Sequence, residues 1–375
     1  MKTTLLYIIA FATLVLSSCT GRSAAGPQGA GDSVEMRYAR YLDIVKHDGF
    51  TLVKLKDPWN KGKTLHTYIL VKATDAMPAD IPEGTVIRTP LKKSLISTSV
   101  HCAMLISLNR AESIKGVCDL QYINIPEIKE KAQKGGITDC GSSMSPLIEN
   151  VIELHPDAIL LSPFQNSGGY GKLDKLGIPI IEAAEYMEAT PLGRAEWIKF
   201  YGMLWDAEEA ADSIFNSVES AYNELKALAA TTKSKKTILM DTQTGSVWYV
   251  PGGKSTIGQL IKDAAKEYPF GNNDNSGSLQ LSFETVLERA QDADIWLLRY
   301  GGKAPLTLGE LKGGQPGYAQ FKAFRQGEVY GCNTLTSTFY EDTPFHPERL
   351  LRDFIMIAHP ELGIEGHTGY FFKLQ

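Results

Sequence analysis

The chain has 375 residues, 43% of them hydrophobic and 22% charged, which is the composition of a folded globular protein. This length exceeds the size at which one hydrophobic core stops growing, so two domains are expected. The formal net charge of -5 argues against nucleic acid or an anionic membrane surface as a partner.

The first residues resemble an export signal. Lys2 precedes an apolar run over residues 5–16, which is too short to span a bilayer and long enough for the core of a signal peptide. The run ends in Leu16-Ser17-Ser18-Cys19, which resembles the lipobox of bacterial lipoproteins, where the cysteine becomes the first residue and carries the lipid. An ordinary cleaved leader with a chance cysteine is the alternative.

We therefore predict a signal peptide over residues 1–18, lipidation at Cys19 and a lipid-anchored tether over residues 19–33, rich in Gly, Ala and Ser. This predicts a protein of the cell envelope, on the periplasmic side, that meets a membrane only through its lipid.

Four further cysteines follow, and their spacing fits no zinc-binding pattern. Outside the cytosol they could form disulfides, and a Cys118–Cys140 pair is one reading. Unpaired buried thiols are the other reading. The four are Cys102, Cys118, Cys140 and Cys332.

Alternating apolar residues at 51–55, 65–71 and 86–87, separated by Pro and Gly, predict hairpin-like strands in a β-rich N-terminal extension. A strand over 94–99 and a helix over 100–108 are expected next.

The stretch from Asp206 to Ala229 predicts one long amphipathic helix. Its apolar residues recur at three- and four-residue spacing, it contains no Gly or Pro, and Asp206 with Glu209 has the spacing of a capping box. Such a rod suggests a stiff connector between two lobes. The alternative is a long helix inside a single large domain.

A short motif repeats on both sides of this helix. Glu149, Glu153 and Asp157 fall four residues apart and precede an apolar strand at 158–161. The same spacing recurs in Glu284, Glu288 and Asp292, before an apolar strand at 293–298. Each is half of a βαβ unit.

The second lobe is then expected to contain a strand over 237–241, a helix over 257–265 and a final helix over 347–358. The predicted fold class is α/β, with two Rossmann-like lobes joined by a single long helix. The expected boundaries are 34–190 for the N-terminal lobe with its β extension, 191–232 for the linking helical segment and 233–375 for the C-terminal lobe.

No motif assembles a catalytic site. Gly253-Lys254-Ser255-Thr256 lacks the first glycine of a P-loop, and Gly169-Tyr170-Gly171 lacks the last glycine of a dinucleotide fingerprint. No zinc-protease motif and no nucleophile elbow occur. We therefore predict a protein that is not an enzyme and has no intrinsic cofactor or metal site. A lipoprotein hydrolase is the alternative from another class, with His101 beside Cys102 as its one candidate pair, and a purely structural envelope lipoprotein is a third.

Aromatic residues follow several predicted strands. Phe164 and Tyr170 follow the strand at 158–161, Arg299 extends the strand at 293–298, and Trp248-Tyr249 lies just past the strand at 237–241. Ligands of open α/β sheets bind outside the carboxyl ends of the strands. These loops therefore predict a wide cleft for a flat or apolar-edged ligand.

The lipobox, the stretch PLIENVIELHPDAILLSP, the central region PLGRAEWIKFYGMLWDAEEAADSIF and the stretch SFETVLERAQDADIWLL resemble the class III substrate-binding proteins of ABC importers. The resemblance covers residues 84–360. It implies a monomer that captures a metal chelate and delivers it to a transmembrane permease with its ATPase. It also implies that exposed Glu149 and Glu284 dock on that permease. The implied ligand contacts are Thr98, Ser99, His101, Phe164, Tyr170, Trp248, Tyr249, Arg299 and Tyr340.

The resemblance implies an iron chelate, either a ferric siderophore or haem, and leaves a corrinoid (cobalamin) as the alternative. Haem would need an axial His or Tyr, for which His101 or Tyr170 could serve. A catecholate siderophore would need several cations in the cleft, where only Arg299 and Lys254 are candidates.

Overall fold

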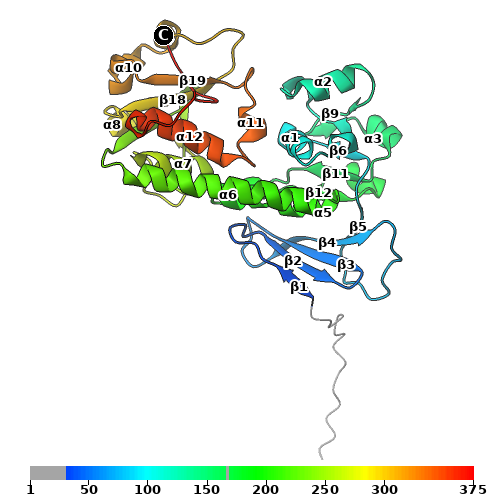
Figure 1. The fold of residues 1–375 in the computed structure, drawn as a ribbon. Helices are drawn as coiled ribbons and strands as arrows, with labels where there is room; N and C mark the ends of the chain where they lie inside the picture. Colours follow the sequence, from blue (N-terminus) through cyan, green and yellow to red (C-terminus); the bar gives the residue numbers. More distant parts are fainter. Residues whose placement is uncertain (1–30, 166–168) are drawn as a thin grey trace, which may run out of the picture.

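The computed structural model of the protein describes residues 31–165 and 169–375. Two α/β lobes stand side by side along one long helix, α6, and a separate β-sheet lies on the opposite side of the helical segment (Figure 1). We call these parts the extension sheet (residues 32–89), the N-lobe (90–190), the linking segment (191–232) and the C-lobe (233–375). The predicted signal peptide and Cys19 lie outside the described residues.

The extension sheet has five strands in the order β1-β2-β3-β4-β5. Neighbours are antiparallel except β4 and β5, which are parallel, so the expected hairpin is wrong for the last pair. The twelve residues between these two strands are long enough to return the chain to the same end of the sheet. The strands are β1 (Asp32–Val34), β2 (Leu42–His47), β3 (Phe50–Lys56), β4 (Thr64–Lys72) and β5 (Thr85–Thr89).

The N-lobe contains a sheet of five parallel strands in the order β8-β7-β6-β11-β12. The chain therefore moves outward from β6 in one direction and then in the other, as in a doubly wound fold, and its switch point lies between β6 and β11. The strands are β6 (Ser94–Ile96), β7 (Ile114–Val117), β8 (Thr138–Asp139), β11 (Ala158–Leu161) and β12 (Ile180–Glu182). The α-helices are α1 (Ser99–Ser107), α2 (Pro126–Gln133) and α3 (Ile148–Leu154), and a small β9 (Gly141–Ser142) and β10 (Ser145–Pro146) pair lies beside them.

The linking segment consists of α4 (Pro191–Glu196), α5 (Ile198–Leu204) and α6 (Glu208–Thr231). The predicted start of the long helix at Asp206 is wrong by two residues. Asp206 adopts a left-handed backbone, with φ +52°, and its carbonyl oxygen accepts a hydrogen bond from Arg110 Nη2 at 2.5 Å. Ala207 is the N-cap, and no side chain caps the helix.

The C-lobe sheet has the order β16-β13-β18-β19-β20, parallel except for β20 at the edge. Its switch point lies between β13 and β18. The strands are β13 (Lys236–Met240), β16 (Lys266–Glu267), β18 (Ile295–Tyr300), β19 (Val329–Asn333) and β20 (Phe372–Lys373). The α-helices are α7 (Thr256–Ala265), α8 (Phe283–Ala290), α9 (Leu308–Gly314), α10 (Lys322–Gln326), α11 (Phe339–Asp342) and α12 (Pro347–Ala358), the last with the predicted bounds.

A second, antiparallel sheet of the C-lobe corrects the prediction for Trp248. This residue lies in β15 (Val247–Pro251), which pairs with β14 (Gln243–Thr244) and β17 (Ser278–Leu281), rather than in a loop. Successive residues of a strand point to opposite faces, so Trp248 is fully buried while Tyr249 is 44% exposed.

Two buried carboxylates attach the extension sheet to the helical segment. Glu196 accepts hydrogen bonds from the backbone N–H groups of residues 37–39, at 2.7 to 3.0 Å. Glu188 accepts from the backbone N–H groups of residues 40 and 41 and from Trp197 Nε1. Because buried carboxylates need several donors, these bonds join the extension sheet specifically to the linking segment, through Glu196, and to the last residues of the N-lobe just before it, through Glu188.

The structure decides between the two readings of the cysteines. Cys102, Cys118, Cys140 and Cys332 are free thiols, all buried, so the Cys118–Cys140 disulfide is not formed. Burial raises the pKa of Cys102 to about 12 and that of Cys118 to about 11, which keeps both thiols protonated near neutral pH. Within the described ranges, no helix combines the length and apolar character needed to cross a bilayer.

Candidate functional site

Each lobe has its switch point at the carboxyl ends of its parallel strands. Helix α1 follows β6 in the N-lobe and packs against α11, which follows β19 in the C-lobe. Next to this contact, Asn124 of the N-lobe donates from Nδ2 to the carbonyl oxygen of Thr334 at 3.0 Å and from its backbone N–H to Glu341. The two lobes are therefore in direct contact where α1 meets α11.

A pocket of about 160 Å³ lies beside this contact, and we call it the inter-lobe pocket. It is lined by the N-lobe, the linking segment and the C-lobe together. Two of the predicted ligand contacts, Arg299 and Tyr340, line it. Its other lining residues are Val100, Pro191, Arg194, Thr256, Ile257, Leu260, Phe339, Thr343, Pro344, Pro347 and Leu350.

Arg299 is not a free cation. Its Nε donates to Asp241 Oδ1 at 2.9 Å and its Nη2 to Asp241 Oδ2 at 2.5 Å, a two-pronged pair across the switch point of the C-lobe. Burial alone would lower the pKa of Arg299, but the hydrogen bonds and charge of Asp241 raise it. Asp241 follows β13 and Arg299 lies in β18, so the pair joins the two strands where the chain reverses direction.

Arg194 of α4 is a pocket residue that the sequence did not reveal. It lies in the linking segment, 105 positions before Arg299, and no local pattern in the chain separates it from a surface arginine. Only the packing of α4 against α7 and α12 of the C-lobe brings Arg194 to the wall of the inter-lobe pocket.

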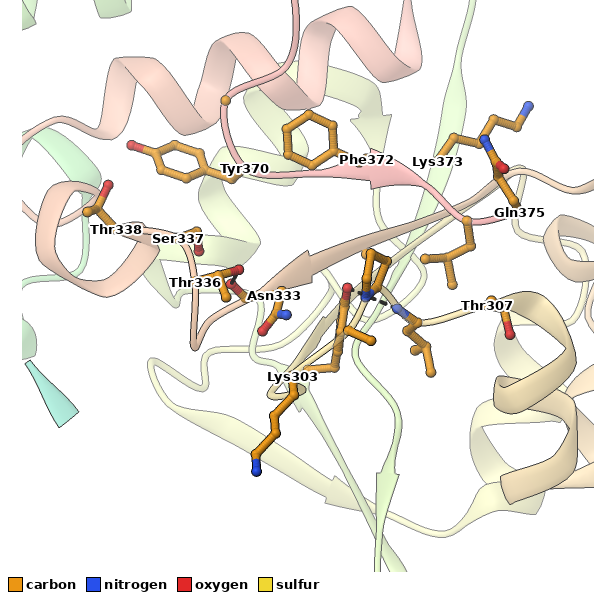
Figure 2. Close-up of a pocket in the computed structure, with 17 residues that line it drawn as sticks. Lys303, Thr307, Asn333, Thr336, Ser337, Thr338, Tyr370, Phe372, Lys373 and Gln375 are labelled. Atoms are coloured by element: carbon orange, nitrogen blue, oxygen red, sulfur yellow. Dashed lines mark hydrogen bonds between the residues drawn. The ribbon is translucent and has the colours of Figure 1, made fainter. Parts of the chain in front are cut away.

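A second pocket, of about 270 Å³, lies between α1 and the start of α12 and is also lined from both lobes. Thr338 lines it and also lines a larger pocket of about 770 Å³ that belongs to the C-lobe alone. We call the larger one the C-lobe pocket. Figure 2 shows it between Tyr370 and Phe372 of the C-terminal tail on one side and Lys303 and Asn333 on the other. The C-lobe pocket therefore borders the space between the lobes.

Hydroxyl and amide groups dominate the polar lining of the C-lobe pocket. The C-terminal tail forms one wall and is held by Asp353, which accepts hydrogen bonds from the backbone N–H groups of Gly369 and Tyr370 at 2.7 Å each. Lys373 on this wall pairs with Glu328 at 2.6 Å, while Lys303 is exposed on the opposite side.

His101 is buried, with 1% of its surface exposed, which corrects its assignment as a ligand contact. Its Nδ1 lies 2.6 Å from Thr98 Oγ1, and its Nε2 lies 3.5 Å from Glu185 Oε1. Burial alone would raise the pKa of Glu185, but the nearby His101 and Arg194 side chains and the hydrogen bond from Tyr201 lower it. A bound metal cannot reach this imidazole in the described conformation.

His101 and Cys102, the candidate pair for a hydrolase, are equally inaccessible to a substrate. Cys102 is fully buried and protonated, and the ring of His101 points to Thr98 and Glu185. Neither side chain offers an activated nucleophile at a cleft. Among the described residues, no group of three or more His, Cys, Asp and Glu side chains is arranged to hold a metal ion.

The remaining predicted contacts lie in different places. Thr98 caps α1, and its side chain accepts from the backbone N–H of His101, with half-buried Ser99 as the first helical residue. Phe164 is 49% exposed just after β11, and Tyr340 is equally exposed on α11. Tyr249 is exposed on β15 but lines none of the three pockets above.

Two further sequence candidates are engaged elsewhere. Tyr170 donates to Glu182 Oε1 at 2.7 Å and lines a groove between the N-lobe and the extension sheet, so it does not face the C-lobe. Lys254 pairs with exposed Asp274 at 2.7 Å and lines none of the pockets above.

Glu149 and Glu284, the predicted docking residues, occupy matching positions. Each is the second residue of a short helix, α3 or α8, and each is exposed. Neither forms an ion pair with any described residue. The two helices lie on opposite outer sides of the two lobes (Figure 1).

A family model described as periplasmic binding protein matches residues 115–334, which is more than half of the chain. Two lipoproteins of Methanocaldococcus jannaschii, both named as uncharacterized, are similar along nearly the whole length. One is 27% identical over 361 residues, covering 90% of this chain and 84% of the relative. The other is 26% identical over 386 residues, covering 98% and 96%, so this match includes the extension sheet.

Two solved structures share the fold. A periplasmic heme binding protein from Pseudomonas aeruginosa has a TM-score of 0.59 at 14% identity, covering 76% of this chain and 98% of that chain. A protein of an ABC-type Fe3+-hydroxamate transport system from Saccharomonospora viridis has a TM-score of 0.56 at 18% identity, covering 72% and 94%. Two α/β lobes on one long helix, with a pocket lined from both, agree with the matched family model: the chain belongs to the periplasmic binding protein family.

Proposed function

We propose that the protein is a lipid-anchored, non-enzymatic receptor that captures a metal chelate between its lobes and delivers it to an ABC permease with its ATPase. The observation that carries this proposal is the inter-lobe pocket, which is lined from both lobes and has Arg299 of the C-lobe switch point in its wall, where α/β folds bind ligands. At about 160 Å³ it can hold one part of a chelate, and the rest would lie in the adjacent space between the lobes, which the larger C-lobe pocket borders.

The described residues favour a ferric siderophore over haem. Haem needs an axial ligand from the protein, and both candidates are engaged: His101 is buried against Thr98 and Glu185, and Tyr170 donates to Glu182. A siderophore supplies all the ligands of its iron, so the protein needs to provide only a complementary shape, hydrogen bonds and charge. The C-lobe pocket, at about 770 Å³, is within the size range of small-molecule sites and supplies such hydroxyl and amide groups.

The proposed anchor is Cys19, and two relatives named as lipoproteins support it. The described chain starts at β1, which lies on the side of the extension sheet away from the lobes (Figure 1). A tether leaving from this strand would leave the space between the lobes unobstructed.

The ligand is tested by thermal melting of the purified protein with ferric siderophores, haem and cobalamin. A ligand that binds only the folded state stabilises it, by about 2.7 kcal/mol at a hundredfold excess over Kd. We expect a ferric siderophore to raise the Tm, and haem to give no visible band typical of His or Tyr ligation. A rise with cobalamin alone would replace the iron chelate with a corrinoid. No rise with any of the three contradicts the proposal.

Docking is tested by reversing the charge of both proposed residues, Glu149→Arg with Glu284→Arg. Uptake should fall about tenfold or more, because the proposed contact pairs these carboxylates with basic residues of the permease, and like charges placed across an interface cost several kcal/mol. Ligand affinity should stay unchanged. The matched control is Glu153→Arg with Glu288→Arg, exposed residues one turn further along the same helices, which should transport normally. Loss of ligand affinity in the first pair would place these carboxylates in the ligand site instead.

A further inference from the structure

The loop between β3 and β4 combines several cations with an aromatic side chain. We call this loop, residues 57–63, the hairpin tip. The segment from Lys54 to Lys63 contains four lysines and one aspartate, a formal charge of +3, in a chain whose net charge is -5. The charge of the whole chain therefore does not describe this end of the extension sheet.

Three of these four lysines are unpaired. Lys56 pairs with Asp43 at 2.7 Å. Lys54, Lys61 and Lys63 are exposed and form no ion pair with any described residue. Their charges are therefore open to an external partner.

Two further exposed charges lie at the base of the hairpin and offset each other. Arg40 lies there because the backbone N–H of Lys56 donates to the carbonyl oxygen of the neighbouring Tyr41 at 2.8 Å. Glu83 lies there because it precedes β5, which runs parallel to β4. The positive excess at the tip is therefore not cancelled by its surroundings.

The hairpin tip is a defined turn that projects from the sheet. Asp57 Oδ1 accepts hydrogen bonds from the backbone N–H groups of Trp59 and Asn60 at 2.9 Å each. Gly62 has a left-handed backbone, with φ +83°, and a side chain at this position would meet no atom within 4 Å. The tip is therefore held by its own hydrogen bonds and does not pack against the lobes.

Trp59 is the one tryptophan of five that is not buried. It is partly exposed in the hairpin tip, and its indole N–H donates to no described residue. Tryptophan is enriched where a bilayer meets water, because its ring is apolar and its N–H group is polar. The other four tryptophans are fully buried: Trp197, Trp205, Trp248 and Trp296.

The proposed lipid anchor brings a membrane within reach of the hairpin tip. Cys19 lies thirteen residues before Asp32, the first residue of β1, and a chain of this length spans at most about 45 Å. Asp32 pairs with Lys46 and Lys46 with Thr51 in neighbouring strands. The tip begins six residues after Thr51, roughly 20 Å further along β3, so one lipid surface can meet both the anchor and the tip.

We propose that the hairpin tip binds the surface of an anionic lipid bilayer, with Lys54, Lys61 and Lys63 near the headgroups and Trp59 at the interface. Lysines close to an anionic surface each strengthen binding, and their effect fades within a Debye length. The inference rests on the proposed function only for the anchor that places the membrane, and it adds a second contact to the lipid. Because the lobes lie on the other side of the helical segment, this contact would leave the space between them open (Figure 1).

The test measures vesicle binding of residues 19–375 carrying Cys19→Ser, which contain every described element and lack the lipid. Cosedimentation compares vesicles of phosphatidylcholine with added phosphatidylglycerol and vesicles of phosphatidylcholine alone, in low-salt buffer. We expect about tenfold stronger binding to the anionic vesicles, and we expect high salt to remove the difference because it screens exposed charges.

Two matched pairs of variants locate the contact. Lys61→Gln with Lys63→Gln should weaken binding to anionic vesicles about tenfold or more. Lys233→Gln with Lys235→Gln removes the same charge at exposed lysines of the same spacing beyond α6, and should bind like the parent. Brominated phosphatidylcholine mixed into the anionic vesicles should quench the fluorescence of Trp59, and Trp59→Phe should abolish this quenching. An unchanged Tm of each variant shows that the fold is intact.

The outcomes separate this inference from the proposed function. Equal binding to neutral and anionic vesicles, or equal losses in both pairs of lysine variants, would overturn the inference. Binding to dextran sulfate without binding to vesicles would identify an acidic polymer and overturn the lipid surface as the partner. If the parent binds no vesicles while a chelate raises its Tm, the inference fails and the proposed function stands. Vesicle binding that depends on Lys61 and Lys63, with no response to any chelate, gives the reverse result.

Discussion

The N-lobe and the C-lobe each use a hydrogen-bonded aspartate to hold neighbouring parallel strands together. In each, an aspartate just before a central strand accepts backbone N–H groups from the first strand of the lobe or from the residues just before it. Asp157 accepts from Lys92 and Lys93 at 2.8 Å, and Asp294 accepts from Thr237 at 3.0 Å. These hydrogen bonds fix the register of neighbouring parallel strands independently of any ligand.

The lobes differ in how the helix leads into that strand. Glu149 corresponds to Glu284 in the helices, 135 positions apart, while the two aspartates are 137 apart. The C-lobe therefore has two extra residues between the glutamate and the aspartate, one in the helix and one in the loop that follows it. The repeat in the sequence paired Asp157 with Asp292, and the structure corrects this to Asp294.

The chemistry inside the lobes differs more than their frame. At the matching strand position the N-lobe has Ile159 and the C-lobe has Trp296, both fully buried. Trp296 Nε1 donates to the carbonyl oxygen of Asp241 at 2.7 Å, so the aromatic core of the C-lobe reaches its switch point. The N-lobe switch point carries the neutral hydroxyl of Thr98, whereas the C-lobe carries the Asp241–Arg299 ion pair. The same arrangement of strands therefore carries an uncharged hydroxyl at the N-lobe switch point and a charged pair at the C-lobe switch point.

The largest effect should come from the aromatic core of the C-lobe. Trp248→Ala should lower the free energy of unfolding by about 3 to 5 kcal/mol, because it removes a fully buried ring packed against Trp296. Tyr249→Ala, at the next position on the exposed face, should cost less than about 1 kcal/mol. Urea denaturation compares the two. Equal losses would mean that β15 does not alternate as described.

A smaller contrast is expected between the two switch points. Asp241→Asn leaves Arg299 without its counter-charge in a largely buried setting and should destabilise by about 2 to 3 kcal/mol. Thr98→Ala, the N-lobe counterpart, removes a helix cap and should cost about 1 kcal/mol. The same urea experiment measures both, and the ranking fails if Thr98→Ala is the more damaging change.

The smallest effect concerns pH. Burial alone would raise the pKa of Asp294, but hydrogen bonds from Lys322 and Thr237 lower it. A carboxylate whose pKa is lower in the folded state stabilises the fold at pH values above its unfolded-state pKa of about 3.9. This stabilisation is lost as the pH falls through the folded-state pKa. Asp294→Asn should therefore be about 1 kcal/mol less stable than the parent at pH 7.

This difference should shrink below about pH 4. Asp292→Asn, an exposed neighbour, is the control and should follow the parent at every pH. A constant difference in the free energy of unfolding between the parent and Asp294→Asn across the acid range would show that the charge of Asp294 does not stabilise the fold.

Local patterns predicted the frame better than the site. The final helix has its predicted bounds, and the long helix and the strands before and after it were expected, because apolar spacing reports burial directly. The burial of Trp248 was missed because it depends on pairing of β15 with β17, some thirty residues away, and on packing against Trp296 and Phe321, which no local signal reveals. Burial of His101 and exposure of Arg194 to the pocket depend on packing between helices far apart in the sequence, and a single chain carries no local trace of that packing.

The bonds from Glu188 and Glu196 have a mechanical consequence. They attach residues 37–41 to the helical segment, so the extension sheet cannot shift without carrying that segment along. Arg37 and Tyr38 add contacts to Glu219 of α6, so several bonds join the two parts. If the chain is anchored at its N-terminus, as proposed, a pull on the anchor would reach the linking segment through these bonds before it reaches the C-lobe.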